Sequence, residues 1–501
     1  MVSEHIVPPV HGIVPAPVEF ELLPAESFRL DRETRIIVDP GTQEVGAVAE
    51  ELAAYLRVAT GGDLPVAVAG STEGPAIALS LSGSRELGPE GYGLDVDRRG
   101  VRLAAVTPAG LFRGIQTLRQ MFYRAGPPAP PVISAVRVTD YPRFGWRGAM
   151  LDVARHFMPV EAVKRYVDLM ALYKMNILHL HLTDDQGWRI FLDSWPRLAE
   201  QGGRLQVGGT PGGYYTKPQY TELVRYAKAH YITVVPEIDT PGHTNAALAS
   251  YPELNCTGEA PPPYTGTAAG IGSLCIDKEV TYRFLNDVVR EISVLTPGEY
   301  FHIGGDEASQ ISAEGYVRFL ARAGQIPRAH GKKLLGWHEI ARGDPPPDAV
   351  AQYWGNASST DAEDLARAAV EKGMMLVMSP SDRVYLDMKY DPSTPLGVSW
   401  AGFIDVRTSY EWDPATLVVG VGEEDVLGVE AALWTETIAD IRDAEFMSFP
   451  RLPGVAEIGW SPSGRSWEEY RLRLATHGGP WAAMAINFYR SPQVPWEEVA
   501  T

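Results

Sequence analysis

Tyr300-Phe301-His302-Ile303-Gly304-Gly305-Asp306-Glu307 is a mostly apolar stretch that runs through two glycines into two adjacent carboxylates. The pattern predicts a buried β-strand over 300–304 that ends just before the acids. Because side chains alternate along a strand, Asp306 and Glu307 can share one pocket only where the regular strand has ended, and the glycines permit this. Polar groups directly after a buried strand are typical of the carboxyl-terminal face of an α/β barrel, where such folds hold their reactive side chains.

The surroundings of this acid pair separate it from other adjacent acids in the chain. Glu423-Glu424, Glu468-Glu469 and Glu497-Glu498 stand in polar surroundings and are typical of a solvated surface. A carboxylate at the end of an apolar strand has to overcome a desolvation cost, so native chains keep it mainly where it is paired or used. We therefore interpret Asp306 and Glu307 as functional.

Strand-like and helical segments alternate along the chain from about residue 141 onward. Apolar residues at positions 160, 163, 167 and 170 predict a helix over 160–175, and further helices are expected at 220–230, 280–294 and 361–371. Eight strands in such an alternation favour a closed parallel (β/α)8 barrel over an open sheet. The expected strands are 149–153, 177–182, 232–238, 300–304, 333–337, 349–354, 374–378 and 429–434.

The first part of the chain follows a different pattern. Short strand-like runs at 35–38, 77–81, 92–96 and 101–105 accompany helical periodicity at 45–56 and 109–122, with a hairpin turn expected at 97–100. Strands grouped with segregated helices predict a small α+β domain. The proline-rich segment 126–131, a strand-like run at 132–138 and Asp140-Tyr141-Pro142 mark its end, so we expect one domain over 1–140 and a barrel over 141–501.

Composition narrows the range of partners. The 501 residues include 44 lysines and arginines against 63 aspartates and glutamates, a formal net charge of -19, which argues against nucleic acid or an anionic membrane as a partner. Every apolar stretch is too short to span a bilayer, and Met1-Val2-Ser3-Glu4-His5 lacks the basic-then-apolar pattern of an export signal. We expect a water-soluble chain, and removal of a signal before the numbering begins stays open.

The two cysteines, Cys256 and Cys275, bracket a loop rich in proline and glycine. Two cysteines at the ends of one loop predict a disulfide, which forms in an oxidising compartment. The alternative is a pair of reduced, buried thiols. We expect a secreted, extracellular protein, with a cytoplasmic location as the second choice.

Reactive residue types recur just after the expected strands, as a barrel requires. Aromatic planes combined with acids and one arginine suit a carbohydrate, because a sugar ring presents CH faces for stacking and hydroxyls that both donate and accept hydrogen bonds. A single tryptophan is equally typical of a core, but three at strand ends favour a binding site. These residues are Arg155 with His156, Asp184 with Asp185, Glu237 to Asp239 with His243, Asp306 with Glu307, Trp337 to Glu339, Trp354, Tyr385 with Asp387, and Trp434 with Glu436.

A metal site is the competing interpretation of one motif. His179-Leu180-His181 is similar to the paired histidines of metal-dependent amidohydrolase barrels, but those have the pair on the first strand and need further histidines and an aspartate. His338-Glu339 lacks the second histidine of a zinc-protease helix. We expect His179 and His181 to pack and form hydrogen bonds inside the barrel, and we expect no metal and no cofactor.

Four motifs together resemble glycoside hydrolase family 20, the β-N-acetylhexosaminidases, and most closely its bacterial, Streptomyces-like members. The resemblance extends over nearly the whole chain and implies a (β/α)8 barrel with a smaller N-terminal α+β domain. The motifs are 151–157 (LDVARHF), 179–186 (HLHLTDDQ), 236–243 (PEIDTPGH) and 302–307 (HIGGDE).

The resemblance implies an exo-acting, retaining hydrolase that removes terminal N-acetylglucosamine or N-acetylgalactosamine. In this family the 2-acetamido oxygen of the sugar attacks its own anomeric carbon and forms an oxazolinium-like intermediate. Glu307 would be the general acid and then the base, and Asp306 would orient the acetamido group. An ionised Asp306 favours the protonated form of Glu307.

The remaining roles also follow from the resemblance. Tyr385 would donate a hydrogen bond to the acetamido oxygen, and Asp184 and His243 would support the acid. The substrate-binding residues would be Trp337, Trp354 and Trp434 around the acetyl methyl, Arg155, Asp387 and Glu436 on ring hydroxyls, and Trp400 on the aglycone side.

Three other functions stay open at this stage. They are a carbohydrate-binding protein that has lost catalysis, a metal-dependent hydrolase that uses His179 and His181, and a family relative that releases a disaccharide. The preferred sugar, the linkage, the natural substrate, the role of the N-terminal domain and the oligomeric state are also open.

Overall fold

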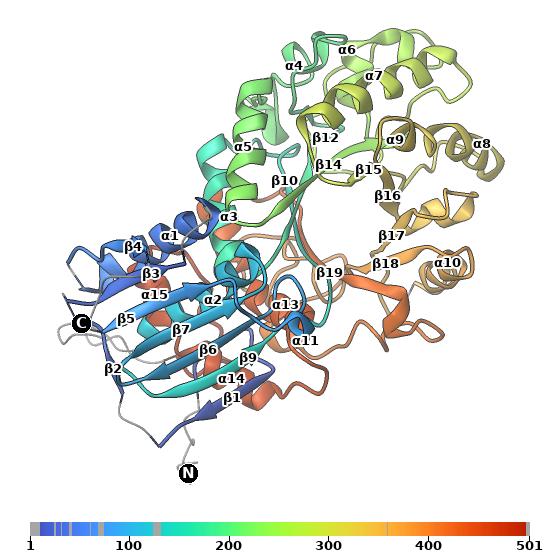
Figure 1. Ribbon diagram of the computed structural model, residues 1–501. Coiled ribbons are helices and arrows are strands. Elements are labelled where there is room, and N and C mark those ends of the chain that lie inside the picture. The colour runs from blue at the N-terminus through green and yellow to red at the C-terminus, as the bar shows by residue number, and fades with distance from the viewer. Residues whose placement is uncertain are drawn as a thin grey trace.

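The computed structural model describes residues 11–24, 27–31, 33–39, 43–60, 62–68, 75–123, 132–357 and 359–496 (Figure 1). They form a mixed sheet with helices, built from the first part of the chain, and a closed barrel built from the rest. The opening residues 1–5, the proline-rich segment 126–131 and the acid pair Glu497-Glu498 lie outside the described residues.

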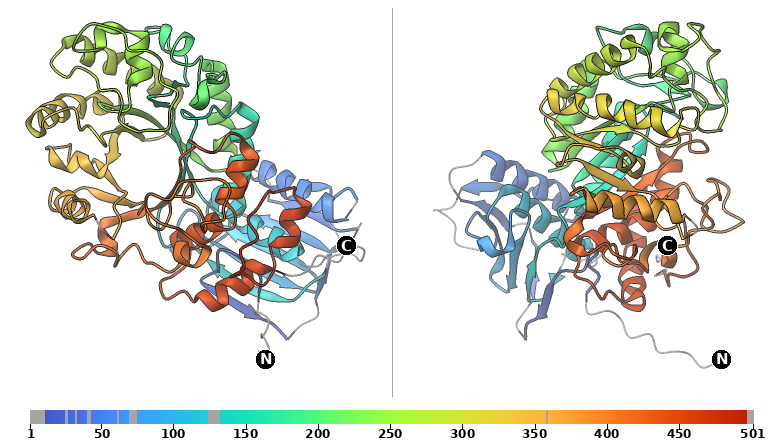
Figure 2. Two further views of the ribbon diagram at one scale, coloured as in Figure 1. Left: turned by 180° about the vertical axis from the view of Figure 1, so that it is seen from behind. Right: turned by 90° about the vertical axis from the view of Figure 1, so that its right-hand side faces the viewer.

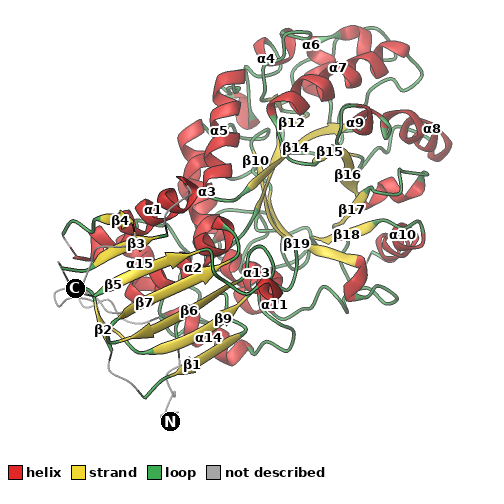
Figure 3. Cartoon of the chain, viewed as in Figure 1, coloured by secondary structure: helices red, strands yellow, loops and turns green. Residues whose placement is uncertain are grey.

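Eight parallel strands close the barrel, which confirms the predicted architecture (Figure 3). The first strand pairs with both the second and the last, Met150 lying opposite His179 on one side and Ala432 on the other. The strands are β10 (Trp146–Asp152), β11 (Ile177–His181), β14 (Thr233–Thr240), β15 (Tyr300–Gly304), β16 (Lys333–Trp337), β17 (Val350–Tyr353), β18 (Met375–Met378) and β19 (Val426–Leu433).

Helices surround the barrel, and among the described residues none is both long and apolar enough to cross a membrane (Figure 2). The predicted helix 160–175 ends earlier, because Lys174 has φ 61° and turns the chain toward β11. The principal helices are α3 (Val160–Leu172), α5 (Lys217–Ala229), α7 (Glu279–Leu295), α8 (Ala313–Ala323), α10 (Thr360–Glu371), α12 (Ile441–Ser448), α13 (Arg451–Trp460) and α14 (Trp467–Ala475).

Side chains fill the inside of the barrel in layers. Because residues two apart point the same way, Ile177, His179 and His181 of β11 stand one above another along the barrel axis. An apolar layer lies at the amino-terminal ends of the strands, and a polar layer lies above it. The apolar layer is Trp146, Ile177, Val235, Leu335, Val350 and Val377, and the polar layer includes His179, Glu237, His302, Gln352 and Glu430, all fully buried.

The N-terminal part is a seven-stranded mixed sheet, with α1 (Gln43–Thr60) and α2 (Pro108–Tyr123) packed together against it. The predicted strand at 132–138 is two strands, because β8 (Val132–Ile133) pairs with β2 (Phe28–Arg29) while β9 joins the main sheet. The main sheet has the order β1 (Glu19–Leu22), β9 (Val136–Asp140), β6 (Tyr92–Asp97), β7 (Gly100–Ala105), β5 (Ala76–Ser80), β3 (Arg35–Val38) and β4 (Val66–Val68).

A buried carboxylate joins the two parts. Asp140, the last residue of β9, pairs with Lys174 at 2.8 Å and accepts hydrogen bonds from the hydroxyl of Tyr92 and the indole N–H of Trp460. Lys174 directly precedes β11, so this junction lies at the amino-terminal end of the barrel strands. The residues that the sequence predicts for the active site belong to the barrel part and are expected at the opposite, carboxyl-terminal end of its strands.

Candidate active site

The turn after β15 places the two adjacent acids. Gly304 and Gly305 have φ values of 72° and 104°, in the left-handed region that favours glycine. A Cβ on Gly304 would come within 1.7 Å of an oxygen of Asp239, so no larger residue fits there. Asp306 is buried, whereas the side chain of Glu307 is 43% exposed, so the two carboxylates occupy different environments.

A cleft opens at the carboxyl-terminal end of the strands. It brings together eleven of the twelve residues for which the sequence predicts catalysis or substrate binding. Asp184 is the exception, because it lies behind His243 instead of at the surface of the cleft. The lining residues are Arg155, His243, Ala269, Asp306, Glu307, Trp337, Trp354, Tyr385, Asp387, Trp400, Trp434 and Glu436, of which only Ala269 was not predicted.

One histidine contacts both acids of the pair. The Nδ1 atom of His243 lies 3.1 Å from Asp184 Oδ1, and its Nε2 atom lies 3.3 Å from Glu307 Oε2 and 3.4 Å from Asp306 Oδ2. Burial alone would lower the pKa of His243, but the carboxylates of Asp184, Asp306 and Asp239 raise it well above its ordinary value. His243 is therefore a cation held between carboxylates.

Aromatic rings form one wall of the cleft. The rings of Trp337 and Trp434 lie 5.7 Å apart, and the ring of Tyr385 lies 6.1 Å from that of Trp434. Trp400 is 56% exposed and meets Trp354 and Tyr385 edge-on at 6.4 and 5.8 Å. Apolar faces enclose the inner part of the cleft, and one exposed indole stands at its mouth.

Charged side chains form the rest of the cleft, next to the aromatic wall. Arg155 pairs with Asp184 at 2.8 Å, approaches Glu436 at 4.0 Å and lies over the ring of Trp434. Burial, together with the charge of Glu436, raises the pKa of Asp387 well above its ordinary value. Asp387 Oδ1 and Asp306 Oδ1 are buried and find no hydrogen-bond partner among the described residues. Such atoms are acceptors that a bound ligand can satisfy.

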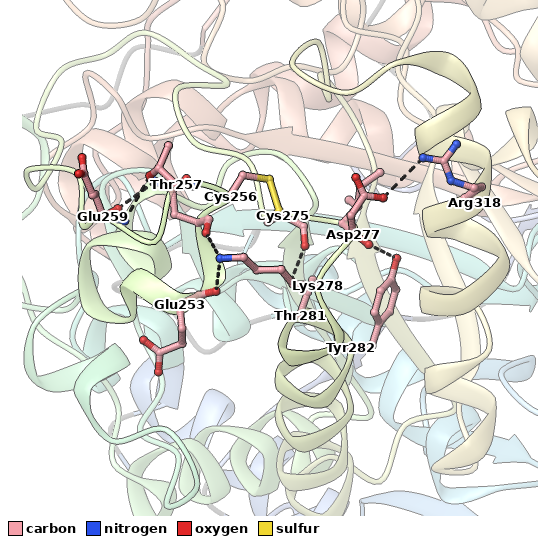
Figure 4. Close-up of a disulfide and its surroundings, with 12 residues drawn as sticks. Glu253, Cys256, Thr257, Glu259, Cys275, Asp277, Lys278, Thr281, Tyr282 and Arg318 are labelled. Atoms are coloured by element: carbon pink, nitrogen blue, oxygen red, sulfur yellow. Dashed lines mark hydrogen bonds and ion pairs between the residues drawn. A yellow bond between two sulfur atoms is a disulfide. The ribbon is translucent and has the colours of Figure 1, made fainter.

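The disulfide-closed loop forms part of the rim. Cys256 and Cys275 are bonded in the structure (Figure 4). The carboxylate of Asp185 accepts three backbone N–H bonds, from Asn245, Ile271 and Gly272, at 2.7 to 3.0 Å. Two of these donors belong to the disulfide-closed loop. Asp185 thus holds the loop that carries Ala269 against the cleft.

Two acids near the cleft have contacts that the sequence did not reveal. Glu339 Oε2 accepts a hydrogen bond from Trp354 Nε1 at 3.1 Å, and burial, reinforced by Asp306, raises the pKa of Glu339 to about 8. Glu237 Oε1 accepts a hydrogen bond from Trp337 Nε1 at 3.0 Å. The sequence placed both acids at strand ends and assigned them no role, but only Glu339 follows its strand, because β14 continues past Glu237 to Thr240.

Several buried groups have the ligand types of a metal site. Within one such group, nitrogens of His179 and His302 lie 3.0 Å from oxygens of Glu237. His181 uses both ring nitrogens, one with Glu237 and the other with Asp184 at 2.8 Å. These contacts are those of a hydrogen-bonded ion-pair network, as predicted for the two histidines on β11.

A (β/α)8 barrel with paired carboxylates and an aromatic-walled cleft at the carboxyl ends of its strands defines a glycoside hydrolase. The catalytic-domain model of glycosyl hydrolase family 20 matches residues 144–463, and the model of domain 2 of the same family matches residues 10–141. The chain belongs to glycosyl hydrolase family 20.

Close relatives span almost the same length. The chain is 42% identical over 491 residues to the Beta-N-acetylhexosaminidase of Cellulomonas fimi, covering 97% of each. It is 51% identical to the β-N-acetylhexosaminidase of Streptomyces coelicolor A3(2), with a TM-score of 0.94 and coverage of 98% of this chain and 99% of that one. The N-acetyl-β-hexosaminidase of Streptomyces plicatus in complex with Thio-NAglucal gives 50% identity with the same TM-score and coverage. A mutant of that enzyme is in complex with its product GlcNAc.

Proposed function

We propose that this protein is an exo-acting, retaining β-N-acetylhexosaminidase that releases terminal N-acetylglucosamine by substrate-assisted catalysis. The observation that carries the proposal is the juxtaposition of Asp306 and Glu307 with the aromatic wall of one cleft. The relatives named above carry the same enzyme name, and one of them binds GlcNAc as product.

The polar side of the cleft is suited to hold the terminal sugar. Arg155 donates to ring hydroxyls, and Asp387 and Glu436 accept from them. We infer that these groups bind the residue at the non-reducing end, which is the basis of exo action. The buried, unpartnered Asp387 Oδ1 gains a hydrogen-bond partner when the sugar binds.

The aromatic wall is suited to hold the acetamido group. Trp337, Trp354 and Trp434 enclose its methyl, and the Tyr385 hydroxyl donates to its oxygen. Asp306 accepts the amide N–H and stabilises the positive charge that develops as the oxygen attacks the anomeric carbon. An internal nucleophile held in line has a large proximity advantage over an external one.

Glu307 transfers the proton. It donates to the departing glycosidic oxygen as the C–O bond breaks, and the acetamido oxygen forms the new bond to carbon, giving an oxazolinium ion. Glu307 then accepts a proton from water as that water opens the ring, so two inversions give net retention. His243, held by Asp184, positions Glu307 and balances the charge of the acid pair.

The contacts weigh against the other candidates. An inactive binding protein would not need the acid pair, Tyr385 and His243 arranged together. Release of a disaccharide would need room for a second sugar beyond Arg155 and Asp387, and the chitobioside assay below tests for it. A metal-dependent hydrolase would need His181, whose two nitrogens are engaged by Glu237 and Asp184.

We further propose β-linked N-acetylglucosamine oligosaccharides of the chitin type as the substrate class, and export from the cell. The exposed indole of Trp400 offers a stacking surface for the leaving sugar. The disulfide of the rim loop supports export, since such bonds persist in oxidising compartments. A boundary between residues 140 and 141, where β9 ends, stays our proposed division of the chain.

The test is turnover of nitrophenyl glycosides. We expect hydrolysis of the β-N-acetylglucosaminide, with retention seen by NMR of the first-formed product, and almost none of the β-glucoside, which lacks the internal nucleophile. Comparable rates on both sugars, or a trapped ester between enzyme and sugar, would contradict the proposal. Parallel assays with the galactosaminide and with chitobiosides measure sugar preference and disaccharide release.

A further inference from the structure

One buried carboxylate in the polar layer of the barrel touches both halves of the active site. Glu237, in the middle of β14, is fully buried and uses both of its oxygens. Its Oε1 accepts a hydrogen bond from Trp337 Nε1 at 3.0 Å, and its Oε2 bonds to Nδ1 of His181. The hydrogen bond to Trp337 connects Glu237 to the aromatic wall, and the hydrogen bond to His181 connects it to the acid pair.

The contacts that begin at His181 end at the proposed proton donor, Glu307. His181 Nε2 lies 2.8 Å from Asp184 Oδ2, and Asp184 Oδ1 lies 3.1 Å from His243 Nδ1. His243 Nε2 in turn contacts Glu307 at 3.3 Å. Hydrogen bonds therefore connect Glu237 to His243, and a close contact without hydrogen-bond geometry continues the series to Glu307.

The hydrogen bond to Trp337 connects Glu237 to the aromatic wall of the cleft. Trp337 is 1% exposed, and its indole N–H is its only polar group. Because Glu237 accepts from that N–H, the carboxylate sets how the indole plane stands in the cleft. The same plane packs against Trp434 at 5.7 Å and against His302 at 5.0 Å.

We propose that Glu237 is a positioning residue that couples the acetamido-binding wall to the proton donor, so that neither can shift without the other. The proposal rests on the function proposed above. A carboxylate is planar and rigid, so a rotation that improves the bond to Trp337 strains the bond to His181. Burying a carboxylate carries a desolvation penalty, so it is significant that both oxygens of Glu237 have hydrogen-bond partners.

The charges around Glu237 support this arrangement. Nitrogens of His179 and His302 lie 3.0 Å from its oxygens, His179 also pairs with Glu430 at 2.8 Å, and Asp239 interacts electrostatically with Glu237. Burial alone would raise the pKa of Glu237, but the imidazoles of His302, His181 and His179 lower it well below its ordinary value. Glu237 is thus an anion that can accept two hydrogen bonds at once.

The direct test is Glu237→Gln, with Glu430→Gln as the matched control. Glu430 is an equally buried carboxylate of the polar layer that bonds to Trp146 and His179 and does not reach the cleft. We expect Glu237→Gln to lower kcat/KM on the N-acetylglucosaminide by about ten- to a hundred-fold, since a small misplacement of catalytic groups has that effect. A cyclic thiazoline analogue of the intermediate should bind more weakly, and the pH profile of kcat/KM should shift. Glu430→Gln, which reaches Glu237 only through the shared His179, should change both readouts much less.

The coupling itself is tested with two further variants, one at each hydrogen-bond partner of Glu237. They keep the proposal testable if Glu237→Gln fails to fold. His181→Asn removes the ring that links Glu237 to Asp184, together with its edge-on contact with Trp434, and Trp337→Phe removes the indole N–H together with part of the ring. If Glu237 couples the two, their effects on thiazoline affinity should depart from additivity by at least about five-fold in a double-mutant cycle. Additive effects would overturn the proposal, as would a folded Glu237→Gln enzyme whose affinity and pH profile match those of Glu430→Gln. If the unmodified enzyme does not turn over N-acetylglucosaminides at all, that result would instead refute the proposed function.

Discussion

The Nε2 atom of His243 lies 3.3 Å from Oε2 of Glu307, at the point where the buried network of the barrel meets the cleft. The other ring nitrogen of His243 is held by Asp184, so the imidazole cannot turn away from the acid. His243 is 3% exposed, whereas the Glu307 side chain is 43% exposed. The Glu307 carboxyl, our proposed proton donor, therefore has one side against His243 and the other exposed, where a leaving group and water could approach.

Replacing Glu307 with Gln should remove the proton donor while keeping the shape of the side chain. We expect turnover of substrates with poor leaving groups, such as chitobiose, to fall by roughly a hundred- to ten-thousand-fold. Nitrophenyl glycosides need less help from an acid, so their first step should slow less. Equal losses on both substrates, measured by steady-state kinetics, would point to a role other than proton donation.

Replacing Asp306 with Asn should remove the charge that stabilises the oxazolinium ion. Loss of such a preorganised electrostatic contact lowers kcat by roughly a hundred- to a thousand-fold. The cyclic thiazoline analogue, which resembles the charged intermediate, should bind more weakly to this variant by a similar factor. Circular dichroism serves as the control for folding, and unchanged activity in a folded variant would discredit acetamido assistance.

Replacing Glu339 with Gln should change how stability depends on pH. Glu339 has a side chain that is 14% exposed and a pKa raised to about 8 from an ordinary 4.5. The folded state therefore holds a proton that the unfolded state releases between these two values. The contribution to stability is fully present below pH 4.5 and is lost as the pH rises to 8, at up to about 1.4 kcal/mol per pH unit.

The measurement is the free energy of unfolding in urea at several pH values. The Glu339→Gln variant keeps an oxygen for the Trp354 N–H and has nothing to ionise, so its stability should fall less steeply over this range. The surface substitution Glu424→Gln is the control and should follow the unmodified protein. Parallel curves for the unmodified protein and Glu339→Gln would show that Glu339 does not titrate in this window.

Replacing Asp185 with Ala should release the rim loop. Three backbone N–H groups lose their shared acceptor, and leaving such groups unsatisfied costs about 1–3 kcal/mol each. We expect faster proteolytic cleavage between residues 256 and 275 and a higher KM for oligosaccharides, because Ala269 lines the cleft. An unchanged cleavage pattern would contradict the role of Asp185 as the anchor of the loop.

Opening the disulfide provides the comparison for that experiment. The Cys256→Ser, Cys275→Ser variant should lose roughly 3 kcal/mol of stability, the value expected for a loop of this length. Asp185 still holds Ile271 and Gly272 in that variant, so KM should change less than in Asp185→Ala. Thermal unfolding and KM measured side by side separate the covalent contribution from the hydrogen-bonded one.

Local sequence patterns located the barrel strands well. The strands β15 and β16 have the bounds that the apolar runs predict, because both are buried and end at glycine or at a polar turn. Patterns were weaker where a single residue ends an element, as at Lys174, whose positive φ stops α3. The run 132–138 reads as one strand, but two separate partners divide it. The barrel interpretation makes successive strands neighbours, whereas nothing in the sequence shows the strand order of the N-terminal sheet.

The candidate site was also predictable only in part from the sequence. Acids and tryptophans just after strands were visible in the sequence because every strand of a parallel barrel ends at the same face. Ala269 was not visible, since an alanine in a loop carries no chemical signal and reaches the cleft only because Asp185 anchors that loop. Asp184 carries a clear signal, yet its place behind His243 follows from the fold alone.

The amino-acid sequence by itself determined the alternation of strands and helices, the two glycines that free the backbone after β15, and the residue types that meet at the barrel face. These depend on local steric rules and on the period of apolar residues. Only the tertiary structure decided that Glu237 touches both Trp337, which lies 100 positions later in the chain, and His181, which lies 56 positions earlier. Such contacts arise when the sheet closes and inward side chains of distant strands meet in one buried layer, where each polar atom must find a partner.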